Sequence, residues 1–292
     1  MKSLLKRRTA GDWFFDQFNI LFMILFCIAT VYPFLYLIAM SFGGSANMGF
    51  SLIPAHAETE AYLRVFSNKH IATGFFNSVK RTLLGTGITL FFTICTAYAL
   101  SKKHFPNRTF WTGFIVFTMF FSGGLIPEYL RVRGLGIYNS IWAMILPGLI
   151  SAYNMIIMRN SFMSLPYGLE ESAKIDGAND IVILFRIVVP VSVPIIATVA
   201  LWTSVGHWNA WFDCMIYIQD TSRQVLQIIL RRIVLEGTSQ LMELNSSVDT
   251  GTASPDSIKA ATIIVATIPI LLVYPFIQKY FVKGIMVGSF KG

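Results

Sequence analysis

Six long apolar stretches constrain this chain more than any other feature of its sequence. A helix needs roughly 20 apolar residues to cross about 30 Å of hydrocarbon, and each stretch is close to that length or longer. Hydrophobic residues make up 54% of the chain and charged residues only 13%, whereas a soluble domain carries about 25% charge. We therefore predict an all-α membrane protein with six transmembrane helices, at residues 18–40, 73–101, 110–127, 141–158, 191–211 and 260–281.

Basic residues at the ends of these stretches set the expected orientation. Lysine and arginine collect on the cytoplasmic side of membrane proteins, and here they precede the first stretch and follow the second. The first stretch lacks the small-residue cleavage site of a signal peptide, so we expect a retained anchor after a cytoplasmic segment at residues 1–17. Both termini are then cytoplasmic, and residues 18–292 form a single transmembrane domain. The net charge of +8 reflects this topology rather than a nucleic-acid partner.

Several segments are expected on the external side. Lys80 and Arg81 lie near the external end of the second helix, so they must reach outward to water or face a polar cavity. The connector at residues 121–140 is rich in glycine and proline, which predicts irregular backbone with a short surface helix. Polar segments at residues 41–71 and 212–258 complete this side.

A polar segment at residues 163–190 joins the fourth and fifth stretches on the cytoplasmic side. Pro166 can begin a short helix, because a first-turn residue needs no backbone donor. Gly177 supplies the left-handed turn that often ends a helix, and Asn179 is a good N-cap for a second short helix. We therefore predict two short helices with an elbow between them. The charged residues expected to face a partner are Glu170, Glu171, Lys174 and Asp176.

The residue spacing within this segment is more specific than its polarity. Glu171, Ser172 and Ala173 are followed after three residues by Gly177, and nine residues further on by the run from Ile187 to Pro190. An ordinary solvated loop has no reason to match such a pattern on both sides of the glycine. The segment resembles the signature loop of the membrane subunits of ATP-binding-cassette (ABC) importers. It departs from the usual pattern at Ser172, where alanine is commoner, and at Val189, where leucine is commoner.

The resemblance extends from about residue 75 to the end of the chain. It is strongest to carbohydrate importer permeases, a group that includes the maltose-type second permease, the branch often called LplC-type and the permeases for alginate fragments. The matching stretches are residues 121–130, 144–162, 205–218, 226–234 and 281–292.

The resemblance implies a type I ABC importer permease fold in the bacterial cytoplasmic (inner) membrane, in contact with lipid. It also implies a heterodimer with a second homologous permease subunit, two copies of an ABC ATPase, and an extracytoplasmic solute-binding protein that delivers an oligosaccharide substrate. Since the sequence holds no GxxxxGK(S/T) loop, ATP and Mg belong to the partner ATPase. This chain is then no enzyme and binds no cofactor. The residues implied in ATPase coupling are Glu170, Glu171, Ala173, Asp176, Gly177, Ala178 and Pro190.

Polar and aromatic side chains of the membrane stretches are candidates for the substrate path, because a sugar needs hydrogen-bond partners and aromatic faces. An aromatic belt at the membrane interface is the alternative explanation for the tryptophans. His207 also suits an interhelical hydrogen bond, and polar residues inside a membrane usually face the bundle interior. The candidates are Asn77, Asn154, Trp202, His207, Trp208 and Asn209.

Arginines on the expected external side suggest an anionic substrate. Guanidinium groups pair well with carboxylates, so a uronic-acid oligomer such as alginate would meet complementary charge. Lipid headgroups and acidic residues of the docked binding protein are alternative partners for these arginines, and a neutral oligosaccharide stays open as the substrate. The arginines are Arg131, Arg133, Arg223, Arg231 and Arg232.

Other classes of function fit the sequence less well. An ion-coupled secondary sugar transporter, the main alternative, needs ionisable groups near the bilayer midplane, whereas Glu128 and Asp213 lie at the edges of their stretches. An enzyme needs a nucleophile with a base, or a metal, but His207 and Asp213, expected on one helix, match no catalytic motif. The three cysteines show no metal-ligand spacing, so we predict no metal site.

Overall fold

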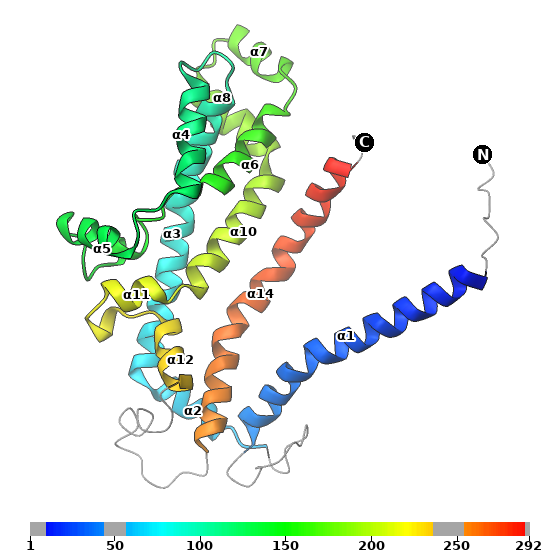
Figure 1. The fold of residues 1–292 in the computed structure, drawn as a ribbon, viewed down its shortest axis with the longest axis vertical. Helices are drawn as coiled ribbons and strands as arrows, with labels where there is room; N and C mark the ends of the chain where they lie inside the picture. The colour runs from blue at the N-terminus through cyan, green and yellow to red at the C-terminus, as the bar shows by residue number, and fades with distance from the viewer. Residues whose placement is uncertain (1–9, 44–56, 236–253, 290–292) are drawn as a thin grey trace. The chain divides into compact units, whose positions relative to one another are not determined.

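The computed structural model describes residues 10–43, 57–235 and 254–289, and the regular structure among them is helical (Figure 1). The predicted all-α class is therefore confirmed for the described part of the chain. These residues belong to two compact units, one of residues 1–67 with 238–265 and the other of residues 68–237 with 266–292. The basic residues before residue 10 and parts of the predicted external segments lie outside the described ranges.

The smaller unit contains α1 (Ala10–Phe42), α2 (Glu60–Ser67) and the first turns of α14 (Pro255–Ser289). α1 covers the first predicted span. Apart from the last turns, where Ala39 is buried, its apolar residues are exposed, as suits a helix surrounded by hydrocarbon. α2 is tied to the end of α1, because Ser41 Oγ lies 2.8 Å from Tyr62 Oη and the ring centroids of Phe42 and Tyr62 are 5.1 Å apart.

The larger unit is built around α3 (Lys69–Ser101), a helix of 33 residues. Asn68 caps its start, where the side-chain oxygen accepts hydrogen bonds from the N–H groups of His70 and Ile71. α3 packs most extensively against α10 (Val193–Asn209), α6 (Ala152–Met163) and α12 (Leu226–Leu235). The unit also contains α4 (Arg108–Phe120), α5 (Leu125–Gly134), α7 (Gly168–Ile175), α8 (Asp180–Ile183), α9 (Val189–Val191) and α11 (Phe212–Tyr217), with the shorter turns η1 (Ile141–Met144), η2 (Leu184–Val188) and η3 (Thr221–Arg223).

Three helices are long and apolar enough to cross a membrane, at Gly11–Phe42, Lys69–Ser101 and Pro255–Val273. Two bent pairs meet the same criterion if each pair is one span. These are α4 with α5, bent by 116°, and Asp180–Val191 with α10, bent by 84°. The described residues thus provide three to five candidate spans, and the count of six stays a prediction.

Glycine causes the bend in the third predicted span. The helix expected over residues 110–127 ends at Phe120, and Gly124 adopts a φ of +85° before α5 begins in a new direction. Glycine adopts this conformation without the steric cost that a Cβ atom would add. α5 is the short helix that the connector sequence predicts.

Proline lies at the break in the fourth predicted span and near the start of the fifth. The single helix expected over residues 141–158 is wrong in its first half, since η1 ends at Met144 and α6 begins only at Ala152. Pro147 lies between them and has no N–H to donate to a helical ladder. The fifth span, expected over residues 191–211, begins after a turn at Ser192, which is flanked by prolines, and ends at Asn209.

The core of the larger unit lies between α3, α6 and the segment from α8 to α10. Met155 and Met158 of α6 are fully buried there with Ala97 of α3 and Val199 of α10. Gly74 and Gly85 allow side chains of neighbouring helices to lie close to the α3 backbone, as small residues often do in membrane helix pairs. A Cβ atom on Gly85 would lie 2.5 Å from His207 Nε2 of α10, whereas one on Gly87 would meet nothing within 4 Å.

Replacing Gly85 by alanine should destabilise the protein, because the new methyl group overlaps the His207 ring and overpacking costs about 1–3 kcal/mol. Gly87→Ala is the matched control on the same helix. It should leave stability unchanged or raise it slightly, since alanine is the better helix former. Thermal unfolding of the purified protein in detergent measures both variants. Equal melting temperatures would contradict the close packing of α3 on α10.

Candidate functional site

The polar segment of residues 163–190, here called the α7–α8 segment, forms the predicted pair of short helices. α7 ends at Ile175 with Asp176 as its C-cap, and Gly177 follows with a φ of +81°, in the left-handed region. Asn179 caps α8, because its side-chain oxygen accepts a hydrogen bond from the N–H of Val182 at 2.9 Å. The elbow and its cap are therefore confirmed, while α7 begins two residues after Pro166.

One side of the α7–α8 segment is fixed to the C-terminal end of α3. Glu170 forms an ion pair with Lys102, whose ammonium nitrogen also lies 3.9 Å from the centroid of the Tyr98 ring. Ala173 is buried in the core cluster of the larger unit. Within the chain the charge of Glu170 is thus paired with Lys102, and its role toward a partner stays a prediction.

α6 is attached to the same end of α3. Arg159 Nε donates a hydrogen bond to the backbone oxygen of Leu100 at 2.9 Å. This bond satisfies one of the carbonyl groups that the last turn of a helix leaves without an intrahelical partner. α3, α6 and α7 are thus joined by charged side chains at a single end of the unit.

The other side of the α7–α8 segment is exposed and mixed in character. Glu171 and Asp176 are exposed there, and Lys174 lies 3.5 Å from Asp180. Large apolar side chains accompany the charges, and an exposed apolar patch marks a contact surface. Interpretation of the sequence by charge alone missed these residues. They are Tyr167, Ile175 and Ile181, with exposed fractions of 72%, 82% and 68%.

Arg81, in the N-terminal half of α3, is 2% exposed and pairs with Asp213 of α11. Its guanidinium also donates to the backbone oxygens of Ala210 at 3.1 Å and Met144 at 3.3 Å. One side chain thus joins α3, η1 and α11. The prediction that Asp213 shares a helix with His207 is wrong, because the chain breaks between α10 and α11.

A first cavity of about 300 Å³ lies beside this ion pair. Its ionisable lining consists of Arg81, Glu128, His207, Asp213 and Tyr217. The expectation that a cation here faces a polar cavity is therefore confirmed for Arg81. Among the described residues, no group of three or more His, Cys, Asp or Glu side chains could hold a metal ion.

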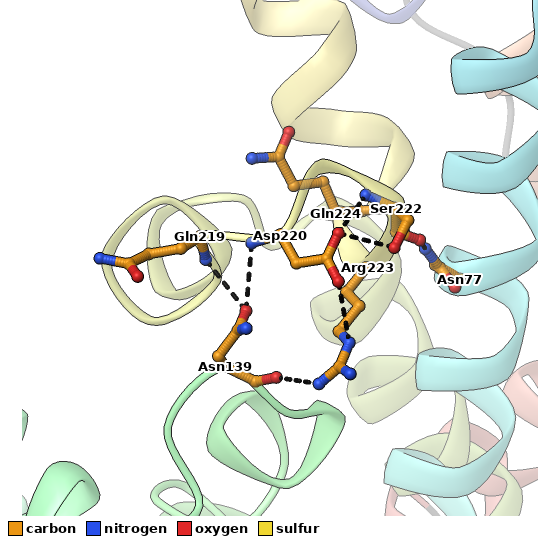
Figure 2. A network of polar contacts seen from close by, with 7 residues as sticks. All are labelled: Asn77, Asn139, Gln219, Asp220, Ser222, Arg223 and Gln224. Atoms are coloured by element: carbon orange, nitrogen blue, oxygen red, sulfur yellow. Dashed lines mark hydrogen bonds and ion pairs between the residues drawn. The ribbon is translucent and has the colours of Figure 1, made fainter.

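A second polar network fixes the turn η3 to α3 (Figure 2). Asn77 Nδ2 donates to the backbone oxygens of Ser222 at 2.8 Å and Gln224 at 2.9 Å. Ser78, the next residue of α3, accepts a hydrogen bond through its Oγ from the N–H of Leu226 at 2.9 Å. These bonds place the backbone of residues 222–226 against the N-terminal half of α3.

Asn139 fixes η3 from the opposite direction (Figure 2). Its Oδ1 accepts hydrogen bonds from the N–H groups of Gln219 and Asp220, each at 3.1 Å, and its backbone oxygen accepts one from Arg223 Nη1 at 2.6 Å. Arg223 Nε lies 3.2 Å from Asp220 Oδ2. Hydrogen bonds from Ser222 hold the pKa of the Asp220 carboxyl below its ordinary value, so this carboxylate stays charged beside Arg223.

A second cavity of about 270 Å³ lies beside this network. Sequence reasoning singled out two of its lining residues, Asn77 and Arg223, as separate candidates, and it did not predict that they share a cavity. The lining residues are Asn77 and Lys80 of α3, Ser140, Ile141, Trp142 and Met144 around η1, and Arg223 of η3.

The predicted substrate-path residues are not brought into one site. Asn77 lines the second cavity, His207 lines the first, and Asn209 is exposed at the end of α10. Trp208 is buried, and its Nε1 donates to the backbone oxygen of Ala266 at 3.2 Å. Of these four residues, Asn77 and His207 therefore line a cavity, and the substrate path stays a prediction.

The other two residues of that set lie together near the start of α6. Asn154 is in the first turn of α6, where its N–H lies 3.4 Å from Ser151 Oγ. Trp202 of α10 has its ring centroid 6.1 Å from that of Tyr153. Neither Asn154 nor Trp202 lines either of the two cavities described above.

The predicted external arginines are also separated in the structure. Arg223 lines the second cavity, whereas the Arg231 guanidinium stacks 3.8 Å from the centroid of the Trp211 ring. The remaining three are Arg131, which is 3.2 Å from Glu128, Arg133, which is exposed on α5, and Arg232, whose Nη1 donates to Gln224 Oε1 at 2.9 Å.

Comparisons with known proteins match most of the chain to membrane components of transport systems. Residues 109–287 match the family described as "Binding-protein-dependent transport system inner membrane component". The polygalacturonan/rhamnogalacturonan transport system permease protein YtcP of Bacillus subtilis (strain 168) is 42% identical, covering 95% of this chain and 98% of that protein. Protein LplC of the same organism is 43% identical, covering 95% of each.

A solved structure shows the same architecture. It is a chain from the crystal structure of a bacterial ABC transporter involved in the import of the acidic polysaccharide alginate. The two chains are 30% identical and superimpose with a TM-score of 0.88, which covers 94% of this chain and 99% of the other. The resemblance predicted from the signature spacing, including its LplC-type and alginate branches, is therefore confirmed.

Asp213→Asn should destabilise the protein by about 3–5 kcal/mol, because it leaves Arg81 as a buried charge without its counter-ion. Asp256→Asn is the control, since that carboxylate is exposed and its ion pair with Lys259 lies at the surface. Thermal unfolding in detergent compares the two variants. If Asp213→Asn melts at the control's temperature, the ion pair does not hold α3 to α11.

Proposed function

The chain belongs to the family of binding-protein-dependent transport system inner membrane components, and from that premise we propose that it is a membrane subunit of an ABC importer for acidic oligosaccharides. The observation that carries the proposal is the similarity to sugar-import permeases over nearly the whole chain. The exposed α7–α8 segment, attached by an ion pair to the end of α3, supports the same conclusion from the structure.

A uronate-containing substrate is supported by two independent comparisons. One relative is named for transport of polygalacturonan and rhamnogalacturonan, whose galacturonate units each carry a carboxylate. The solved transporter imports alginate, which its description calls acidic. The two proteins are described with different polymers, and both polymers are acidic. We therefore propose uronate oligomers as a class and no single member of it.

The proposed assembly contains a second homologous permease subunit, two copies of an ABC ATPase and an extracytoplasmic solute-binding protein. The family description supports dependence on a binding protein. ATP and Mg would be held by the ATPase. In the cytoplasmic membrane the chain would cross six times, with both termini and the α7–α8 segment on the cytoplasmic side.

The α7–α8 segment would transmit movement of the ATPase to the membrane helices. Its exposed side, with Glu171 and Ile175, would contact the ATPase, while the Glu170–Lys102 pair on its other side passes displacement to α3. The hydrogen bond between Arg159 and Leu100 would make α6 move together with α3. Closure of the ATPase dimer would then change the packing of α3 against its neighbours and expose the path to the outside.

Uptake by the reconstituted complex tests the proposal. The chain is co-expressed with its partner permease and ATPase, reconstituted in proteoliposomes and supplied with the binding protein. We expect ATP-dependent accumulation of radiolabelled trigalacturonate, and little accumulation of the neutral analogue galactotriose. Uptake driven by an ion gradient without ATP would contradict the proposal and favour a secondary transporter. Uptake of galactotriose alone would contradict the acidic substrate class.

Glu171→Lys should abolish ATP-dependent uptake while the complex still folds, because the reversed charge lies on the exposed side of α7. Gly177→Leu should act similarly, since leucine adopts the left-handed backbone of the elbow only at a cost of about 1–2 kcal/mol. Asp256→Lys, a charge reversal at an exposed site on α14, is the control. Uptake and ATPase activity are measured together. Normal transport by both loop variants would place the coupling contact elsewhere.

A further inference from the structure

We propose that the second cavity, bounded by Lys80, Arg223 and Trp142, binds one uronate unit of the substrate. This inference rests on the proposed function, because it names where on the chain an acidic sugar is held. The lining places two cations, an aromatic face and two neutral polar side chains around one hollow, and none of the seven lining residues is acidic. The cations can bind the carboxylate of a uronate, the aromatic face can pack against its ring, and the polar side chains can form hydrogen bonds with its hydroxyl groups.

Lys80 supplies the uncompensated charge. Among the residues that the structure describes, no acidic group pairs with its ammonium, and the side chain is exposed. Arg223 is different, because Asp220 lies 3.2 Å from its Nε and neutralises part of its charge. A carboxylate entering the cavity would therefore be attracted mainly by Lys80, and charge-assisted hydrogen bonds are the stronger kind.

Arg223 contributes a hydrogen-bond donor in a fixed orientation rather than an uncompensated charge. Its Nη1 is bonded to Asn139 and its Nε faces Asp220 (Figure 2), so two of the nitrogens are fixed while Nη2 has no bond to a described residue. Arginine loses less freedom on binding when its planar fork is already oriented. The network around η3 thus fixes the orientation of Nη2, which can donate a hydrogen bond at one wall of the cavity.

Neutral groups would orient the sugar ring. The Trp142 ring is 43% exposed and lines the cavity, and aromatic faces pack against the apolar side of sugar rings. Asn77 uses its amide nitrogen for η3, which leaves its side-chain oxygen to accept from a hydroxyl group. The volume of about 270 Å³ is below the roughly 300–1,000 Å³ of pockets for drug-sized ligands. It suits one sugar unit rather than a whole oligomer.

The cavity lies far from the α7–α8 segment along α3. Ser101 lies 21 residues after Lys80, which corresponds to about 30 Å of helix, the thickness of the hydrocarbon core. With the α7–α8 segment in the cytoplasm, the cavity would open on the external side, where the binding protein releases its sugar. It would be a first contact for the substrate on this subunit.

Equilibrium dialysis of radiolabelled trigalacturonate against the assembled complex in nanodiscs, without binding protein, tests the site. Lys80→Gln should weaken binding about tenfold or more, as expected for loss of a charge-assisted bond, whereas Lys80→Arg should retain most of the affinity. Trp142→Ala should weaken binding several-fold. Lys69→Gln removes the same charge from an exposed position of the same helix outside the cavity, and should change nothing.

The possible results distinguish a failure of the proposed binding site from a failure of the proposed function. Equal affinity of wild type, Lys80→Gln and Lys69→Gln overturns the site, whether or not the complex imports trigalacturonate. Galactotriose bound as tightly as trigalacturonate overturns it too. If Lys80→Gln weakens docking of the sugar-free binding protein and leaves trigalacturonate binding unchanged, the cavity receives a protein carboxylate instead. Binding through Lys80 without ATP-dependent import would support the site and contradict the proposed function.

Discussion

The larger unit of this protein depends on the attachment of other segments to a single helix, α3. At its C-terminal end, the Lys102–Glu170 ion pair and the bond from Arg159 to Leu100 hold α7 and α6. In its N-terminal half, Arg81 holds α11 and η1, and Asn77 holds η3. A helix that satisfies its own backbone hydrogen bonds is one of the few structures that can cross hydrocarbon. Polar side chains at the two ends can therefore be linked rigidly through the apolar middle.

The polar contacts of α3 differ in what they contribute. Arg81 is almost fully buried, and a buried ion pair offsets the desolvation of its charges only when further hydrogen bonds complete it. Two backbone oxygens do so here. Lys80, the neighbouring residue, remains exposed without an acidic partner among the described residues. Adjacent cations on one helix thus serve different purposes, one holding the fold together and the other left accessible to an anion.

Local features of this fold could be predicted from the sequence, and long-range pairings could not. The elbow at Gly177, the cap at Asn179 and the short helix after Gly124 each follow from a few neighbouring residues, and the structure confirms them. Arg81 and Asp213 are 132 residues apart, and Lys102 and Glu170 are 68 apart. No periodicity signals such pairs. The break near Pro147 lies in a stretch apolar enough to predict one continuous helix, so hydrophobicity alone does not reveal it. The second cavity was missed because its lining comes from three separated segments, and Trp142 and Lys80 carry no motif.

The central claim is that the exposed side of the α7–α8 segment contacts the ATPase in the cytoplasm. Ile175, 82% exposed at the end of α7, is the most direct probe. Ile175→Cys is introduced after Cys27, Cys95 and Cys214 are replaced by serine or alanine, and a short bifunctional thiol reagent is applied to inverted membrane vesicles that contain the whole complex. The account predicts a crosslink to the ATPase subunit whose yield changes when ATP is bound. Labelling of this cysteine by an impermeant thiol reagent from the outside of intact cells, with no crosslink to the ATPase, would contradict it.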